Sequence, residues 1–254
     1  MSDSTTHPEG VRLEVRDLRK SFNGADVLKG ISFKVGPGER FVIMGPSGSG
    51  KSVLLRLIIG LLAPDSGEIL IEGQPSRNAA VHSKYRTAMV FQSAALLTSL
   101  SVGENVGLYL AEHQLKTPAE IDAIVARTLE TVGLKDLQDR SPSELSGGMQ
   151  KRVAIARALV VEPQLVLFDE PTSELDPLMA VTIGEEILKL NERTGATSII
   201  VTHDRELAFA TGHHIAMIHD GRILFMGTPE EVQHNPDPTI QKFITAELAP
   251  PKPR

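Results

Sequence analysis

The stretch "RFVIMGPSGSGKS", residues 40–52, decides the fold class of this chain. An apolar run leads into a glycine-rich turn, which is followed by Lys51, Ser52 and a helical pattern. This order fits the motif G-x-x-x-x-G-K-[ST] in the strand–loop–helix context that the motif requires. It predicts a nucleotide triphosphate site, because the N–H groups of such a loop turn inward as an anion nest. The loop consists of Gly45, Pro46, Ser47, Gly48, Ser49 and Gly50.

The side chains that such a site needs occur in two places. Lys51 can reach the β- and γ-phosphates, and the Ser52 hydroxyl can bind Mg²⁺. A second apolar run, "LVLFDE" at 165–170, ends in two carboxylates, and ligands of open α/β sheets collect at the carboxyl ends of strands. We therefore expect Asp169 in the Mg²⁺ shell and Glu170 orienting or deprotonating a water aimed at the γ-phosphate.

Strand-like runs recur along the chain, with helical patterns between them. Several runs are apolar throughout, as expected of strands that are covered on both faces of a largely parallel sheet. From about 95 to 160 only helical patterns occur, which indicates a helical lobe inserted into an α/β core. "TPAE" at 117–120 and "TPEE" at 228–231 predict helix starts with Thr as the N-cap. The expected strands are 11–18, 31–35, 40–44, 68–73, 87–91, 165–168, 197–202, 214–219 and 222–227.

Composition narrows the classes of function. The chain has 254 residues, no Cys and a formal net charge of −6. The absence of Cys excludes disulfides, thiolate metal sites and cysteine nucleophiles. The negative charge argues against nucleic acid as a partner and against direct adsorption on an anionic membrane. The start of the chain lacks a secretory pattern, and "LLRLIIGLLA" at 54–63 is too short to span a bilayer. We expect a cytoplasmic protein that other proteins hold at any membrane.

A second glycine motif, "SELSGGMQKR" at 143–152, also has the form of a helix start that favours an anion. Together, "LSGGMQKRVAIARAL", the phosphate loop, "LVLFDE" and "VTHD" closely resemble the ATP-binding cassette (ABC) ATPases, over residues from about 11 to 235. In that family two cassettes face head to tail and sandwich two ATP molecules. The resemblance implies that Ser146, Gly147 and Gly148 contact the γ-phosphate held by the phosphate loop of a second copy.

Further roles follow from the resemblance, residue by residue. Gln92 matches the glutamine that touches Mg²⁺ and the attacking water and senses the membrane partner. His203 matches the switch histidine at the γ-phosphate, and Asp176 matches a loop that crosses the dimer interface. Phe22 matches the aromatic residue that stacks on adenine. The chain departs from the family pattern at Phe22, which is often Tyr, and at two further positions, Met149 and Glu174.

The resemblance also implies a layout for the chain. It predicts one ABC ATPase domain over 11–235, with a P-loop core of mostly parallel sheet at about 11–94 and 161–235. It adds an N-terminal antiparallel β subdomain and an inserted α-helical subdomain at about 95–160. Residues 236–254 would form a C-terminal extension, in which "APPKPR" at 249–254 has the composition of a frayed end.

A single cassette without spans is typical of a transporter whose ATPase is a separate subunit. A DNA-maintenance ATPase would need a long heptad segment, and a two-cassette translation factor would need a second cassette in the chain; this chain has neither. A P-loop kinase would not need the motif "LSGGM". The resemblance therefore implies a motor subunit bound to an integral membrane permease on the cytoplasmic side of the inner membrane. ATP and Mg²⁺ would be its cofactors.

The cargo has two candidate classes. The segment "FQSAALLTSLSVGENV" at 91–106 resembles the cassettes of Mla/Mce-associated lipid transporters, as do "SPSELSGGM" at 141–149 and "NPDPTIQKFI" at 235–244. That resemblance implies phospholipid transport between the inner and outer membranes, with an MCE-domain protein and a small regulatory subunit as further partners. A cassette of a small polar-solute importer, of the amino-acid type, is the alternative.

Overall fold

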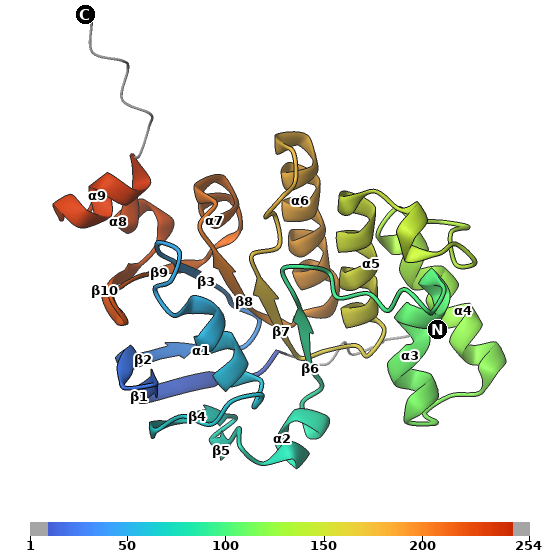
Figure 1. The fold of residues 1–254 in the computed structure, drawn as a ribbon, viewed down its shortest axis with the longest axis horizontal. Coiled ribbons are helices and arrows are strands. Elements are labelled where there is room, and N and C mark those ends of the chain that lie inside the picture. Colours follow the sequence, from blue (N-terminus) through green and yellow to red (C-terminus); the bar gives the residue numbers. More distant parts are fainter. Residues whose placement is uncertain (1–9, 246–254) are drawn as a thin grey trace, which may run out of the picture.

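The computed structural model describes residues 10–245, in which a six-stranded sheet forms the centre (Figure 1). Its strands lie in the order β10-β9-β3-β8-β7-β6, and all neighbours are parallel except β10 and β9. Every residue of β7 and of β8 is buried, as their continuous apolar sequence predicts for central strands. The strands are β3 (Arg40–Met44), β6 (Thr87–Val90), β7 (Leu165–Asp169), β8 (Thr197–Thr202), β9 (His214–His219) and β10 (Arg222–Gly227).

A second, antiparallel sheet has the order β2-β1-β4-β5, with β1 at Leu13–Phe22, β2 at Ala25–Val35, β4 at Ser66–Ile71 and β5 at Gln74–Pro75. β1 and β2 are longer than the sequence patterns predicted. Asn23 and Gly24 join them with φ angles of 50° and 80°, and positive φ at both central residues is the signature of a tight hairpin turn. This turn extends the pairing as far as Phe22 and Ala25. Every expected strand is present, and β5 is an addition.

Helix α1 (Lys51–Ile58) lies between the two sheets and joins their cores (Figure 1). Its Leu54, Leu55 and Ile58 are fully buried and belong to one apolar cluster with residues of β1, β2 and β4 on one side and β3, β7 and β8 on the other. The opposite face of the central sheet is covered by α5 (Gly147–Leu159), α6 (Pro177–Thr194) and α7 (Arg205–Thr211). The phosphate loop between β3 and α1 is therefore anchored at both ends in the core.

Residues 95–160 contain helices and no strand, as predicted. The helices are α3 (Val102–Glu112), α4 (Pro118–Thr131), a 3₁₀ turn (Pro142–Glu144) and α5. The predicted N-caps Thr117 and Thr228 are confirmed, because each side chain accepts a hydrogen bond in a capping box. Ser101 caps α3 in the same way. The boundary of the lobe at about 95 and 160 stays a prediction.

The last described elements are α8 (Pro229–Gln233) and α9 (Pro238–Ile244). Ile240 and Ile244 of α9 are buried in the core cluster that also contains α5, α6 and α7. The short helix α2 (Ala79–Lys84) precedes β6. Within residues 10–245, no helix combines the length and the apolar character that crossing a membrane requires. The frayed end predicted at 249–254 lies outside the described residues.

Candidate nucleotide-binding and hydrolysis site

The phosphate loop has the backbone that the motif requires. Gly50 has φ +96°, and a Cβ there would lie 2.7 Å from Leu28 Cδ2 and 3.1 Å from the Val27 carbonyl oxygen. Only glycine combines that angle with such a close approach. Ser49 Oγ is buried in the loop without a hydrogen-bond partner. An unpaired buried hydroxyl beside inward-turning backbone suits a phosphate oxygen, so the loop fits the ligand that its sequence predicts.

Lys51 lies at the centre of the site and is buried, with a relative exposure of 5%. Its Nζ donates hydrogen bonds to the carbonyl oxygens of Gly45 (2.8 Å) and Pro46 (3.1 Å), and lies 3.6 Å from Glu170 Oε1. Burial lowers the pKa of Lys51, and Glu170 opposes that effect. The ammonium group is therefore held beside the loop in the position from which it can move to a phosphate.

Ser52 and Asp169 meet although 117 residues separate them in the chain. Ser52 Oγ donates to Asp169 Oδ1 at 2.8 Å, and burial raises the pKa of Asp169. Within residues 10–245 no group of three or more His, Asp or Glu side chains gathers to hold a metal ion. A hydroxyl with one carboxylate still fits Mg²⁺, which is commonly bound by one or two carboxylates together with substrate phosphates and water.

Glu170 follows β7 and faces His203 at the end of β8. Its Oε2 accepts a hydrogen bond from the backbone N–H of His203 at 3.1 Å and lies 2.8 Å from His203 Nδ1. Glu170 has φ +47°, a left-handed conformation that is uncommon for a residue other than glycine and is concentrated at functional sites. The parallel pairing of β3, β8 and β7 therefore brings three predicted residues together: Lys51, Glu170 and His203.

Gln92 follows β6 at the edge of the same sheet, and a residue that we did not predict holds its backbone. Lys151 of α5, which is buried, donates its Nζ hydrogen bond to the Gln92 carbonyl oxygen. Burial lowers the pKa of Lys151, while Glu174, Asp169 and Glu170 act in the opposite direction. The sequence analysis assigned no role to this lysine, and basic residues are mostly exposed, so its residue type gave no signal of burial.

The second glycine motif lies apart from the phosphate loop. Ser146 caps α5 by accepting from Met149 N–H (3.3 Å), and a Cβ on Gly148 would overlap the methyl group of Met179. Asp176 caps α6 by accepting from the N–H of the same Met179 at 3.0 Å. The fold thus brings Ser146, Gly147, Gly148 and Asp176 to one pair of helix starts. Across residues 10–245, no hydrogen bond or ion pair joins Ser146 to the phosphate loop.

Phe22 lies at the end of β1, beside the hairpin turn. Its side chain is exposed and lies 5.2 Å from the Lys20 ammonium group, measured to the ring centroid. An exposed ring next to a cation can accept a flat aromatic ligand on its face. The position is compatible with adenine stacking, and that role stays a prediction.

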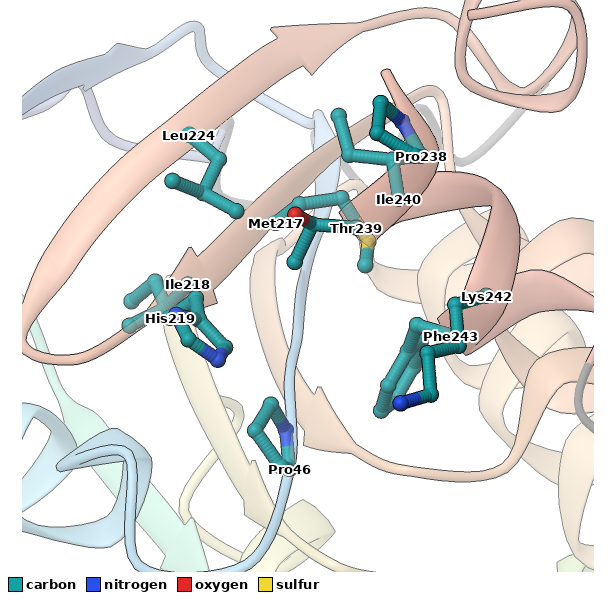
Figure 2. Close-up of a pocket in the computed structure, with 10 residues that line it drawn as sticks. All are labelled: Pro46, Met217, Ile218, His219, Leu224, Pro238, Thr239, Ile240, Lys242 and Phe243. Atoms are coloured by element: carbon teal, nitrogen blue, oxygen red, sulfur yellow. The ribbon is translucent and has the colours of Figure 1, made fainter. Parts of the chain in front are cut away.

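A pocket of about 550 Å³ lies next to the phosphate loop but differs from the site in chemistry (Figure 2). Pro46 borders it at one end, and Leu224 of β10 and Pro238 of α9 border it at the other. Its remaining lining comes from β9 and α9: Met217, Ile218, His219, Thr239, Ile240, Lys242 and Phe243. The lining contains no carboxylate, so this pocket neighbours the hydrolysis site without forming part of it.

The class of protein follows from this geometry. A glycine-rich loop leads into a helix that carries Lys51 and Ser52, and it faces a strand that ends in two carboxylates. This arrangement defines a P-loop nucleoside triphosphatase. The model of the ABC transporter family matches residues 28–173, which is more than half of the chain. The chain belongs to the ABC transporter family.

Relatives with known names match most of the chain. It is 40% identical to protein TRIGALACTOSYLDIACYLGLYCEROL 3, chloroplastic, of Arabidopsis thaliana, over 95% of this chain and 75% of that protein. It is 39% identical to the intermembrane phospholipid transport system ATP-binding protein MlaF of Escherichia coli (strain K12), over 91% of this chain and 88% of that protein. Identity is 37% to the probable ribonucleotide transport ATP-binding protein mkl of Mycobacterium leprae (strain TN), over 93% and 70%.

Solved structures confirm the predicted fold class. A dimeric post-hydrolysis state of the ATP-binding cassette MJ0796, bound to ADP and Pi, has a TM-score of 0.78 and 32% identity, and the match covers 85% of this chain and 98% of that chain. The structure of cbiO1 from Clostridium perfringens, part of the transporter complex cbiONQ, also has a TM-score of 0.78, with 33% identity over 88% and 90%. The chain binds and hydrolyses ATP as the ATPase of an ABC transporter.

Proposed function

We propose that this chain drives the movement of phospholipids between membranes, with ATP hydrolysis at the site described above. The observation that carries the ATPase part is the position of Glu170 after β7, 3.6 Å from Lys51 at the start of α1 and 2.8 Å from His203 after β8. The cargo is supported by the relatives in Arabidopsis thaliana and Escherichia coli, the second of which is named for intermembrane phospholipid transport.

The residues of the site divide the work of hydrolysis. The loop N–H groups, Ser49 and Lys51 would bind the phosphates, and Ser52, Asp169 and Gln92 would hold Mg²⁺, which would neutralise phosphate charge. When Lys51 turns from Gly45 and Glu170 to the phosphates, the Glu170 carboxylate becomes free to orient or deprotonate a water. His203, tied to Glu170, contacts the γ-phosphate.

A second copy completes the site. Ser146 and the two following glycines present free N–H groups at the start of α5, where the helix dipole favours an anion. Within residues 10–245 of one chain, no carboxylate or lysine of the hydrolysis site bonds to this helix start. In the proposed head-to-tail dimer, it contacts the γ-phosphate bound by the other copy, with Asp176 at the interface. The dimeric state of the related cassette MJ0796 supports this arrangement.

In the proposed transporter, a membrane permease moves the lipid and must contact this chain. A groove of about 360 Å³ lies between α2 and β6 on one side and α3 and the end of α5 on the other. Its lining combines apolar side chains, such as Met89, Leu108 and Tyr109, with two histidines and the charged side chains of Arg86, Glu112 and Arg157. Its size and the apolar part of its lining suit the apolar face of a short helix, and we assign it to a cytoplasmic helix of the permease. An MCE-domain protein and a small regulatory subunit complete the proposed assembly.

The experiment is gentle affinity purification of this chain from detergent-solubilised native membranes, with proteins and lipids identified together. Recovery of a permease, an MCE-domain protein and phospholipid supports the proposal. Recovery of a permease with a soluble solute-binding protein overturns the lipid cargo and favours import of a small polar solute. The name of the mycobacterial relative points to yet another cargo, so this measurement is the one that decides.

The variant that tests the groove is Tyr109→Glu, which places a charge among its apolar side chains. We expect this variant to lose the permease while keeping the thermal stability of the wild type, because Tyr109 is exposed. If the permease is recovered equally well with Tyr109→Glu, the groove is not its docking site.

A further inference from the structure

The segment from Gln92 to Ser101 has neither helix nor strand, yet side chains of the neighbouring helices occupy its carbonyl groups. Lys151 binds the Gln92 carbonyl oxygen. Arg157 donates to the Ala94 and Ala95 carbonyl oxygens, each at 2.7 Å. An irregular segment that is anchored at this many carbonyls has one defined shape rather than many.

Asn105 of α3, which is fully buried, anchors the far end of this segment. Its Oδ1 accepts from the Leu97 N–H at 2.8 Å, and its Nδ2 donates to the Leu97 and Ser101 carbonyl oxygens at 2.9 Å. The segment is therefore fixed at its start by Lys151 and at its end by Asn105. In the part of the chain that the structure describes, Arg157 is the side chain that donates hydrogen bonds to the carbonyl groups of residues 93–96.

The backbone is strained at the point that Arg157 holds. Ala94 and Ala95 have φ angles of +57° and +49°, so two consecutive residues with a Cβ adopt the left-handed conformation. Such a conformation persists only when the surrounding structure overdetermines it. The forked guanidinium group reaches both carbonyl oxygens at once, which a lysine ammonium group on a flexible stem matches poorly.

Arg157 also connects two functional places. It lies on α5, whose first turn begins at Ser146, and it lines the groove assigned to the permease. Arg157 lies eleven positions after Ser146, a rise of about 17 Å along a continuous helix at about 1.5 Å per residue. A rigid helix therefore joins the segment behind Gln92 to the proposed contact with the γ-phosphate of the second copy.

We propose that Arg157 is a positioning residue that holds residues 92–97 in their strained conformation and thereby couples the permease groove to the start of α5. The coupling half of this inference rests on the proposed function. A helix that enters the groove meets the Arg157 guanidinium group, which is bonded to the strained segment. When the permease helix shifts Arg157, the movement reaches Ser146 through α5. It reaches Gln92 through the backbone of the segment that Arg157 binds.

The chain offers a matched control on the same helix. Arg152 donates from one guanidinium nitrogen to the carbonyl oxygens of Val132 (3.2 Å) and Gly133 (3.3 Å), just after α4. Arg157→Lys and Arg152→Lys each keep the charge and remove a guanidinium group that binds two carbonyl oxygens. Only the first should affect the segment 92–97.

The first measurement is amide hydrogen exchange of the full chain, without a partner. We expect Arg157→Lys to raise exchange at residues 93–97 at least tenfold, and Arg152→Lys to leave these residues within twofold of the wild type. Thermal unfolding of both variants controls for a general loss of stability. Equal exchange in the two variants would overturn the positioning role.

The second measurement uses the complex with the permease recovered from membranes. We expect Arg157→Lys to bring the ratio of ATPase rates with and without permease close to one, while the amount of permease recovered stays unchanged. Arg152→Lys should keep the wild-type ratio. An unchanged ratio in Arg157→Lys overturns the coupling. If no permease is recovered with the wild-type chain, the proposed function fails and the coupling fails with it, whereas the exchange measurement still decides the positioning role.

Discussion

Two helix starts of this chain carry glycines for an anion, and they are built differently. In the phosphate loop, Gly48 and Gly50 have φ angles of +81° and +96°, so glycine is needed for the backbone conformation. At the start of α5, Gly147 and Gly148 have no positive φ, and glycine matters for close approach: Gly148 packs under Met179. The glycines of the phosphate loop allow its backbone to curve around an anion, whereas the glycines at the start of α5 leave the end of a helix uncovered by side chains.

The difference in neighbouring charges is larger still. Lys51, Asp169 and Glu170 are buried around the first helix start, where Lys51 pairs with Glu170 and Asp169 accepts a hydrogen bond from Ser52. The second helix start has the Ser146 hydroxyl, and that group is used to cap its own helix. The first region thus contains the groups that we expect to carry hydrolysis, and we propose that the second contacts an anion held by another copy. The comparison teaches that two similar motifs in one chain can differ in backbone conformation and in the charges around them.

The largest expected effect tests the chemistry assigned to the first region. Glu170→Gln should lower ATP turnover by about 10³-fold, since general acid–base catalysis contributes 10²–10⁴-fold, while ATP affinity is retained. Steady-state hydrolysis and equilibrium nucleotide binding measure the two effects. Glu206→Gln, on the exposed first turn of α7, is the control and should keep full turnover. Near-normal turnover in Glu170→Gln would remove this carboxylate from the catalytic role.

Lys51→Ala tests whether the first region binds the phosphates. We expect ATP affinity to fall about 30-fold, because a hydrogen bond to a charged group is worth about 1.5–3 kcal/mol. Isothermal titration with Mg²⁺ and ATP gives the dissociation constant. Lys189→Ala, whose ammonium group pairs with Glu186 on α6, is the control. Equal affinity in Lys51→Ala and wild type would contradict the role of the loop.

The two kinds of glycine can be separated by alanine. Gly50→Ala should destabilise the fold by about 2 kcal/mol, because the left-handed conformation and the contact with Leu28 both oppose a Cβ. Gly147→Ala should be neutral or stabilise by up to about 1 kcal/mol, because its nearest neighbour, Leu175, lies 3.9 Å from a Cβ and Ala favours helix. Urea unfolding measures both. Similar losses in the two variants would show that the distinction between the regions is wrong.

The smallest effect concerns the buried charge of the first region. Burial raises the pKa of Asp169, so the ionised carboxylate is disfavoured in the folded state at any pH above that pKa. Without Mg²⁺ or nucleotide, Asp169→Asn should raise Tm at pH 7 by about 2 °C, the shift that roughly 1 kcal/mol produces in a chain of this size. The gain should shrink at pH 4, where the wild-type carboxyl is increasingly protonated. A lower Tm at pH 7 would contradict this account.

Much of the fold follows from local patterns in the sequence. Apolar runs predicted each strand of the central sheet, and Thr-Pro-x-Glu predicted the capped starts of α4 and α8, because these signals lie within a few neighbouring residues. The hairpin between β1 and β2 was underestimated, although Asn23-Gly24 is a recognisable turn pair. β5 is only two residues long and pairs with β4 alone, so no period-2 pattern could reveal it.

The contacts of the segment 92–101 were beyond prediction for another reason. Lys151, Arg157 and Asn105 bind backbone carbonyl oxygens, and every residue carries such a group. The residue types in the sequence therefore do not indicate which carbonyl group such a side chain will bind. Positive φ at Ala94 and Ala95 could not be predicted either, because alanine is a poor indicator of a left-handed conformation.

The sequence by itself determined the phosphate loop, the carboxylates after β7 and the caps of the helices, because each depends on residues that are adjacent in the chain. Only the tertiary structure decided that Ser52 meets Asp169, that Lys51 lies between its own loop and Glu170, and that α5 anchors the segment behind Gln92. These pairs are separated by 59 to 119 residues, and they meet because parallel strands end at one edge of the sheet and the helices pack across it.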